Sequence, residues 1–197
     1  MGTGFIGPVH VEALRRAGVH VAGIVGSSEE KSKAAAERLG LEPRFSTLDD
    51  VLSASDIDSV HLTTPNRFHF DQVSRALGAG KHVLCEKPLA MTSAETSQLL
   101  QLAEKSDRIT AVAYNIRYYP LNHHAAALVH EGDLGSILHV NGSYVQDWLL
   151  SPHDFNWRVL ASEGGALRAV ADIGTHWLDL LQYITGQKIV RVFADLQ

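Results

Sequence analysis

The sequence predicts an α/β fold in which a Rossmann-type doubly wound parallel sheet, lacking its first strand, is followed by the beginning of an α+β domain with a large open sheet. Short apolar runs alternate with helical patterns over residues 1–117, an order typical of βαβ units. A glycine turn, Gly2 to Gly7, opens the first helix, and Glu86-Lys87-Pro88 closes a later apolar run. Ligands of an open α/β sheet bind at the carboxyl ends of its strands, where we expect both features.

Strand-like and helical segments follow one another along the predicted first domain. Two helices carry a start signal, because Thr47 with Asp50 and Thr92 with Glu95 have the spacing of a capping box. The alternation favours parallel strands joined by helices. Strands are expected at residues 19–25, 59–63, 81–85 and 109–114, and helices at 8–17, 29–39, 48–54, 68–77 and 94–105.

The pattern changes after Pro120, and we place a domain boundary near residue 118, between residues 1–117 and 118–197. A partial sheet in the second part would expose a strand edge, which invites association. This part is expected to hold a helix at 121–129, an alternating strand at 137–145, a helix at 175–185 and a strand at 189–194.

Composition indicates a globular protein with no electrostatic signal for nucleic acid or an anionic membrane. The chain has 197 residues, 45% of them hydrophobic, and a formal net charge of −5. No basic run is present, and no apolar run approaches the roughly 20 residues of a membrane span. The single cysteine, Cys85, lies in an apolar run, so we expect a core thiol and a reducing, cytoplasmic compartment.

The glycine turn GTGFIG matches the GxGxxG fingerprint of dinucleotide-binding folds. Its first glycine allows a tight turn, its second lets the backbone approach a pyrophosphate, and its third lets helix and strand pack closely. The amino end of the following helix would offer free amides to the phosphates. Only Met1 precedes the turn, so the usual first strand is absent from this sequence. Unless another segment fills the slot, we expect a destabilised chain that binds its dinucleotide poorly.

The end of the second strand favours NADP, with NAD as the other possibility. An acidic residue normally stands there and bonds the ribose 2′-hydroxyl. Here Ser27 and Ser28 occupy that point and Lys31 follows on the next helix, so hydroxyls and an ammonium would tolerate a 2′-phosphate. The alternative is that the serines only cap the helix, and Glu29 and Glu30 oppose an anion.

Two groups of polar residues further along have simple structural interpretations. Asp172 and His176 stand four residues apart at the start of the helix predicted at 175–185, and Asp172 could simply cap that helix. His123 and His124 have neither metalloprotease spacing nor a cysteine partner, so we expect exposed helix positions and no metal site.

An ordered set of short motifs runs through the whole chain. Besides the glycine turn and Glu86-Lys87-Pro88, it comprises Thr63-Thr64-Pro65-Asn66 with His69, Asn115 and Arg117, Trp157-Arg158, Gly164-Gly165, and Asp172-x-Gly174-x-His176-x-x-Asp179. In this set the chain resembles the glucose-fructose oxidoreductase, inositol dehydrogenase and rhizopine-catabolism (Gfo/Idh/MocA) family. The resemblance implies a Rossmann domain, a second domain on a large open sheet that continues past Gln197, and a homo-oligomeric parent protein, a dimer or tetramer.

The resemblance also implies hydride transfer between NAD(H) or NADP(H) and a carbon of a sugar, cyclitol or related polyol. It assigns Lys87, Asp172 and His176 as the catalytic set. Together with the serine and lysine positions above, the expected cofactor contacts are Gly2, Thr3, Gly4, Phe5, Ile6, Gly7, Ser27, Ser28, Lys31, Thr63, Thr64, Pro65, Asn66, His69, Glu86, Lys87, Pro88, Asn115 and Arg117. The expected substrate contacts are Lys87, Tyr118, Trp157, Arg158, Asp172 and His176.

The chemistry of alcohol oxidation agrees with this catalytic set. A group must take the hydroxyl proton while hydride leaves the carbon, and a neutral imidazole suits that step. We therefore expect His176 to be the base in oxidation and the acid in reduction. Lys87 would donate to the reacting oxygen and stabilise alkoxide charge, and Asp172 would orient the imidazole or hold a substrate hydroxyl.

Alternatives from other functional classes stay open at this point. One is a regulator that senses dinucleotide without turnover, although the joint presence of Lys87, Asp172 and His176 argues against it. Another is an NAD-dependent glycosidase of the same fold, which would cleave a glycoside without net reduction of its cofactor. A third is that this stretch of chain is inactive by itself.

Overall fold

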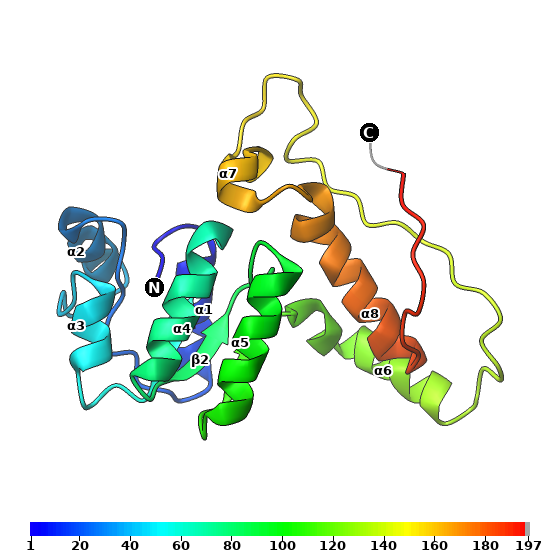
Figure 1. The fold of residues 1–197 in the computed structure, drawn as a ribbon, viewed down its shortest axis with the longest axis horizontal. Coiled ribbons are helices and arrows are strands. Elements are labelled where there is room, and N and C mark those ends of the chain that lie inside the picture. Colours follow the sequence, from blue (N-terminus) through cyan, green and yellow to red (C-terminus); the bar gives the residue numbers. More distant parts are fainter. Residues whose placement is uncertain (196–197) are drawn as a thin grey trace.

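The computed structural model describes residues 1–195 (Figure 1). It contains a three-stranded parallel sheet in the order β1-β2-β3. Leu62, Cys85 and Val112 are aligned across the three strands, so the carboxyl ends lie level along one edge of the sheet. The strands predicted at 59–63, 81–85 and 109–114 are confirmed with shorter bounds: β1 is Ser59–Leu62, β2 is His82–Cys85 and β3 is Thr110–Val112.

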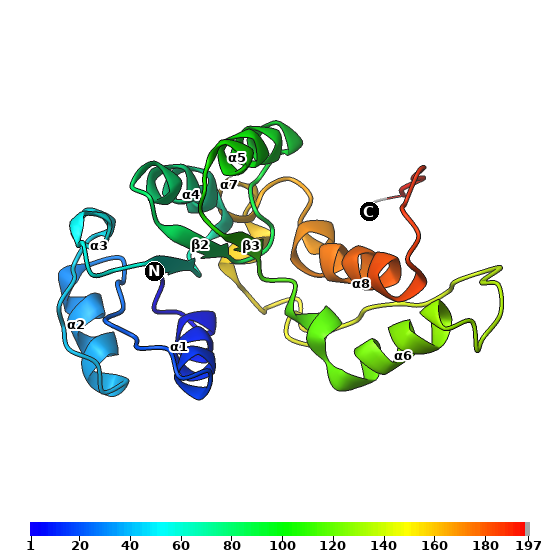
Figure 2. The same cartoon turned by 90° about the horizontal axis from the view of Figure 1, so that it is seen from below.

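Helices cover both faces of this sheet, as βαβ units require. α4 (His69–Gly78) and α5 (Ser93–Lys105) lie on one face, and α1 (Ile6–Arg16) lies on the other (Figure 2). α2 (Glu29–Arg38) and α3 (Leu48–Ser53) lie to the left of the sheet in the same view. All five predicted helices of residues 1–117 are therefore present, with ends that differ by at most two residues.

Both predicted capping boxes are formed. At α3 the Thr47 hydroxyl accepts from the Asp50 N–H at 3.1 Å, and the Asp50 carboxylate accepts from the Thr47 N–H at 2.8 Å. At α5 the Thr92 hydroxyl accepts from the Glu95 N–H at 3.2 Å, and the Glu95 carboxylate accepts from the Thr92 N–H at 3.1 Å. Each box satisfies two amides that the helix itself leaves unpaired.

The main core lies between the sheet and the helices packed on it. Leu62 of β1 and Cys85 of β2 are buried there with Val73 of α4 and Leu99 of α5. Cys85 is 1% exposed, and burial raises the pKa of its thiol. The sequence-based expectation of a core thiol is confirmed.

The strand predicted at residues 19–25 is wrong, because no strand forms in that segment of the described chain. Gly2 donates its N–H to the Val25 oxygen at 2.7 Å. On the opposite side, the Met1 amino group donates to the His61 oxygen at 2.6 Å, and Thr63 donates its N–H to the Met1 oxygen at 2.8 Å. Met1 and Gly2 thus bridge the segment to β1 at one point only, whereas a strand needs a partner along its length.

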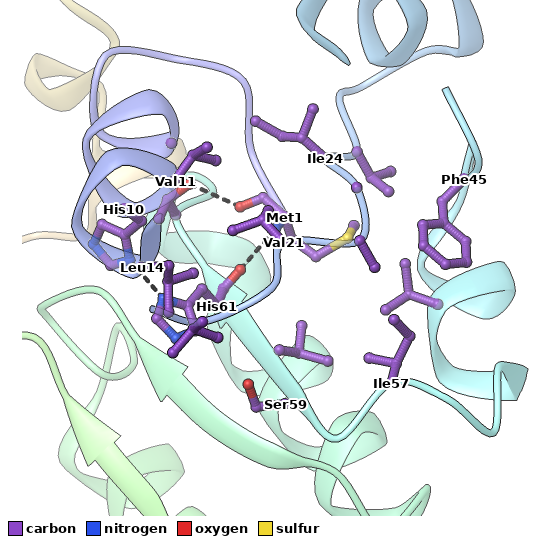
Figure 3. Close-up of a pocket in the computed structure, with 18 of the residues that line it drawn as sticks. Met1, His10, Val11, Leu14, Val21, Ile24, Phe45, Ile57, Ser59 and His61 are labelled. Atoms are coloured by element: carbon purple, nitrogen blue, oxygen red, sulfur yellow. Dashed lines mark hydrogen bonds between the residues drawn. The ribbon is translucent and has the colours of Figure 1, made fainter. Parts of the chain in front are cut away.

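A cavity of about 310 Å³ separates the rest of residues 19–25 from β1 (Figure 3). Apolar side chains including Val11, Ile24 and Phe45 line it. The Met1 amino group is buried beside it, and this burial lowers the pKa of the group to about 6. The cavity occupies the place of a central strand, in agreement with the expectation that two strand positions lack their partner.

The part of the chain after residue 118 is helical where it is regular. α6 (Pro120–His130) packs against α8 (Thr175–Thr185), which confirms the helices predicted at 121–129 and 175–185. The short helices of this part are the 3-10 helix η3 (Trp157–Val159), α7 (Ala161–Gly164) and the π-helical η4 (Val170–Gly174). Two further 3-10 helices lie earlier in the chain, η1 (Asn66–Phe68) and η2 (Asn115–Tyr118).

The strands predicted at 137–145 and 189–194 are wrong as well. Neither segment pairs with another within residues 1–195, and apolar side chains of both face solvent, with Leu138 93% and Phe193 96% exposed. Alternating apolar residues become a strand only where the backbone finds a ladder and the apolar face finds cover. The sheet expected in the second domain is therefore not formed by the residues that the structure describes.

Two other features concern possible metal and membrane sites. His123 and His124 are exposed on α6, as predicted. Within residues 1–195, no three or more metal-ligating side chains gather closely enough to hold an ion. None of the helices in this range has the length and apolar character needed to cross a bilayer.

The three fingerprint glycines have different environments in the turn before α1. Gly2 has a φ of +101°, and a Cβ on it would lie 2.5 Å from the Thr63 oxygen. A Cβ on Gly7 would lie 2.1 Å from the Gly2 oxygen, whereas a Cβ on Gly4 would have nothing within 4 Å. The first and third glycines are thus needed for packing, and the second leaves the backbone open to a ligand.

These environments predict different stabilities for two single substitutions. Gly7→Ala places a methyl group against a backbone oxygen, and we expect it to lower the free energy of unfolding by about 1–3 kcal/mol. Gly4→Ala is the matched control and should leave the free energy of unfolding within about 0.5 kcal/mol of the parent chain. Urea unfolding followed by circular dichroism measures both, and equal losses would contradict the packing described above.

Filling the cavity beside β1 should stabilise the chain. An apolar, β-branched segment of five residues fused ahead of Met1 would pair with β1 and with residues 19–25, and we expect the melting temperature to rise by at least about 5 °C. A glycine-serine segment of the same length is the control. Amide exchange should slow at residues 19–25 only with the apolar segment, and no gain over the control would refute the assignment of this cavity to a strand.

Candidate functional site

The glycine turn meets the loop after β1 at the carboxyl edge of the sheet. The Thr63 hydroxyl donates to the Met1 oxygen at 2.8 Å and to the Gly2 oxygen at 3.2 Å. α1 begins after Phe5 without a side-chain hydrogen bond to its first amides. Those amides and the open backbone at Gly4 fit a pyrophosphate, which binds well at the amino end of a helix.

The rest of the loop after β1 is held from inside the protein. The His69 ring is fully buried, and its nitrogens lie 2.7 Å from the Pro88 oxygen and 2.8 Å from the Thr64 oxygen. The Asn66 amide, also buried, donates to the Gly164 oxygen at 2.9 Å. His69 therefore connects this loop to the turn after β2, and Asn66 connects it to α7. Both side chains are buried, so they support the loop from inside the protein.

Lys87 stands at the end of β2 and reaches into the second half of the chain. Its ammonium donates to the backbone oxygen of Asp172 at 2.7 Å and to the Asp172 carboxylate at 3.0 Å. Arg158 contacts the same carboxylate at 3.2 Å. The Lys87 side chain is only 13% exposed, so this contact brings a mostly desolvated ammonium to the sheet edge.

His176 lies in the first turn of α8 and is mostly buried. The rings of Tyr114 and Tyr144 meet it nearly edge-on, with centroids 5.7 and 6.3 Å away. Its Nδ1 atom is buried without a hydrogen-bond partner in the described part of the chain. Burial lowers the pKa of this imidazole, with a smaller contribution from the Lys87 charge, so the ring is neutral at neutral pH.

Asp172 and His176 are close in sequence but are not hydrogen-bonded to each other in residues 1–195. Asp172 lies in η4, whose π-helical turn is wider than an α-helical turn. The four-residue spacing that places two side chains on one face of an α-helix therefore does not hold here. The Asp172 carboxylate points to Lys87 and Arg158 instead of orienting the imidazole.

Glu86 has a partner that the motifs did not indicate. Its Oε1 atom lies 3.1 Å from Nε2 of His10, and its Oε2 atom accepts from the Lys87 N–H at 3.3 Å. The Lys87–Pro88 peptide bond that follows is cis. The sequence feature that could have indicated His10 is its position three residues after the last fingerprint glycine, in the first helix.

The structure shows the helix cap among Ser27, Ser28 and Lys31, and it places the other two side chains in contact with each other. Ser28 is the N-cap of α2 and accepts from the Lys31 N–H at 3.3 Å. The Lys31 ammonium donates to the Ser27 hydroxyl at 3.1 Å on the exposed surface. A hydrogen bond with Ser28 lowers the pKa of Glu30, so Ser28 also has a carboxylate as a neighbour.

Other predicted contacts are engaged elsewhere or exposed. Arg117 forms two hydrogen bonds with Asp179 and lies over the Tyr183 ring. Tyr118 is exposed and its ring lies beside His123. Asn115, at the start of η2, is exposed as well.

A second cavity, of about 280 Å³, adjoins Asp172 and could take a substrate. Trp148, Arg158 and Arg168 are among its lining residues, and Trp157 packs on the Arg158 guanidinium at 4.5 Å. Trp148 and Arg168 were not predicted, because they lie in irregular segments without a motif. Arg168 has a positive φ of 45°, which is a feature of the structure that its sequence did not indicate.

With this geometry established, comparison with known proteins shows one family along nearly the whole chain. Residues 1–114 match the oxidoreductase family with an NAD-binding Rossmann fold, and residues 122–197 match the GFO/IDH/MocA C-terminal domain. The two matches together leave only residues 115–121 unassigned.

Individual relatives agree with these matches. Levoglucosan dehydrogenase of Pseudarthrobacter phenanthrenivorans is 34% identical over 165 residues, 83% of this chain and 42% of the relative. D-xylose 1-dehydrogenase (NADP(+)) 2 of Haloferax volcanii is 32% identical over 145 residues, 73% of this chain and 44% of the relative. A solved structure of levoglucosan dehydrogenase in complex with NADH and levoglucosan superposes with a TM-score of 0.90 at 33% identity, over 94% of this chain and 53% of that chain.

The chain spans about half the length of these relatives. Within that span, both domain types of the family are matched in the family's order. The fold, the glycine turn and the ordered motifs agree with the matches. The chain therefore belongs to the Gfo/Idh/MocA family of oxidoreductases.

Proposed function

We propose that the protein binds NAD(P) at the glycine turn and transfers hydride between the nicotinamide and a secondary alcohol or carbonyl carbon of a sugar, cyclitol or related polyol. The observation that carries this proposal is the Lys87 ammonium, held by Asp172 at the same sheet edge as the glycine turn. A cation at the carboxyl end of a parallel strand is well placed for a ligand of the sheet. The names of the relatives support the substrate class.

Lys87 and His176 divide the work on the reacting oxygen in this proposal. Lys87 donates a hydrogen bond to that oxygen and stabilises its negative charge, which is more effective in a site of low water content. The neutral imidazole of His176 takes the hydroxyl proton during oxidation and returns it during reduction. The bound nicotinamide supplies the hydride acceptor or donor.

Asp172 is a positioning residue in the proposed mechanism. Its carboxylate and its backbone oxygen both accept from the Lys87 ammonium, which fixes the direction of that side chain. Arg158 is a second cation on the same carboxylate, at 3.2 Å, and helps to fix its position. We propose the cavity beside Asp172, with Trp148 and Arg158 in its wall, as the substrate pocket.

We also propose that the protein accepts both cofactors and prefers NADP. The Ser27 hydroxyl and the Lys31 ammonium form an exposed pair where a 2′-phosphate would lie. Both cofactor forms occur among the relatives, since one is named for NADP and another is solved with NADH.

The division into a cofactor domain, residues 1–117, and a second domain from residue 118 is part of the same proposal.

Titration with NADPH and NADH tests the cofactor site directly. We expect saturable energy transfer from protein to nicotinamide, with NADPH bound about two- to tenfold more tightly than NADH. Lys31→Met should remove this difference, and Lys33→Met, on the same exposed helix, should retain it. Gly4→Ala should weaken both cofactors, because its methyl group enters the space left for the pyrophosphate. Equal affinities in the parent chain would contradict the NADP preference.

Turnover with a panel of sugars and cyclitols tests the proposed reaction. Lys87→Met and His176→Asn should each lower the rate of NAD(P)⁺ reduction by about 10²–10⁴-fold while leaving cofactor affinity nearly unchanged. Lys105→Met, on the exposed end of α5, is the control. Because the pKa of His176 is lowered from 6.5, oxidation should lose rate only below that pH. Cofactor binding without reduction by any substrate of the panel would contradict the proposal.

A further inference from the structure

Three side chains from separate elements form one hydrogen-bonded chain that ends next to Lys87. His61 lies on β1, His10 on α1, and Glu86 directly after β2. The Nδ1 atoms of His61 and His10 are 3.0 Å apart, and Nε2 of His10 is 3.1 Å from Oε1 of Glu86. Figure 3 shows the two imidazoles facing each other beside the cavity next to β1.

The direction of the bond between His10 and Glu86 follows from the chemistry of its ends. An ionised carboxylate can only accept, so Nε2 of His10 must carry the proton that lies between them. In a neutral His10 ring, Nδ1 then has a lone pair and accepts from Nδ1–H of His61. Burial is the largest cause that lowers the pKa of His61, to about 4, so His61 is neutral and can take this role.

Glu86 is thereby held at both carboxylate oxygens. His10 occupies Oε1, and the backbone N–H of Lys87 occupies Oε2. The side chains of His10 and Glu86 are mostly enclosed, with exposures of 14% and 17%. In such surroundings a charge-assisted hydrogen bond is stronger than on an exposed surface. A bond to the Lys87 amide also ties the Glu86 carboxylate to the backbone that carries the proposed catalytic ammonium.

We propose that His10 is a positioning residue that fixes the Glu86 carboxylate, and through it the backbone at Lys87, for hydride transfer. The effect on hydride transfer rests on the proposed function, but the positioning itself does not. Without His10, Glu86 keeps only its long contact with the Lys87 amide, and its carboxylate becomes free to compete with Asp172 for the neighbouring ammonium.

Nuclear magnetic resonance of the chain without cofactor tests the positioning. With ¹⁵N-labelled histidine, His10 should show a protonated Nε2, and Glu86→Gln should shift that resonance while leaving exposed His124 unchanged. His10→Leu should move the backbone amide resonance of Lys87, and His10→Gln, which retains an N–H donor at the Nε2 position, should restore it. The proposal would be overturned if the chemical shift of His10 Nε2 were unchanged in Glu86→Gln, or if that of the Lys87 amide were unchanged in His10→Leu.

Single-turnover kinetics adds a functional readout. We expect His10→Leu to slow hydride transfer about tenfold with the affinity for NADPH within about twofold of the parent chain, and His10→Gln to recover most of the rate. His124→Leu is the control. Equal rates for the two His10 variants would refute the donor role. Absence of turnover in the parent chain, with the resonance shifts present, would instead refute the proposed function and support the positioning.

Discussion

The contact between Lys87 and Asp172 connects the two halves of this molecule at its candidate site. The two residues are separated by 85 positions in sequence, and one carboxylate serves both Lys87 and Arg158. A mostly desolvated ammonium is costly unless it is paired, so loss of Asp172 would remove the carboxylate that Lys87 is paired with in this structure. Asn66 and Arg67 make a second connection, to Gly164 and Glu163 of α7, and hold the same two parts together nearby.

The elements that could be predicted from sequence are those whose stability is local or fully supported by burial. β1 and β2 are short apolar runs with cover on both faces, and the helices at Thr47 and Thr92 start with side chains that cap them. The segments at 19–25, 137–145 and 189–194 have equally suitable residues but lack strand partners within residues 1–195. A strand forms only when a second segment pairs with it, and the pattern of apolar residues in one segment does not show whether such a partner exists.

The candidate site divides in a similar way. The motifs identified Lys87, Asp172 and His176 as candidate site residues. They did not indicate which side chains these residues contact. The π-helical turn at Asp172 redirects its carboxylate from His176 to Lys87, and a spacing rule for α-helices cannot anticipate that. His69 was expected to touch the cofactor, yet it is enclosed by two backbone oxygens, because burial of a polar ring is decided by tertiary packing.

The bonds from Thr63 to the oxygens of Met1 and Gly2 also constrain how this protein can be made. The glycine turn leaves the ribosome before β1, and the oxygens of Met1 and Gly2 then wait for a donor that is 62 and 61 residues later in the chain. Contacts of such high sequence separation close slowly and late in folding. During synthesis the glycine turn therefore lacks the contacts that hold its backbone until β1 has emerged.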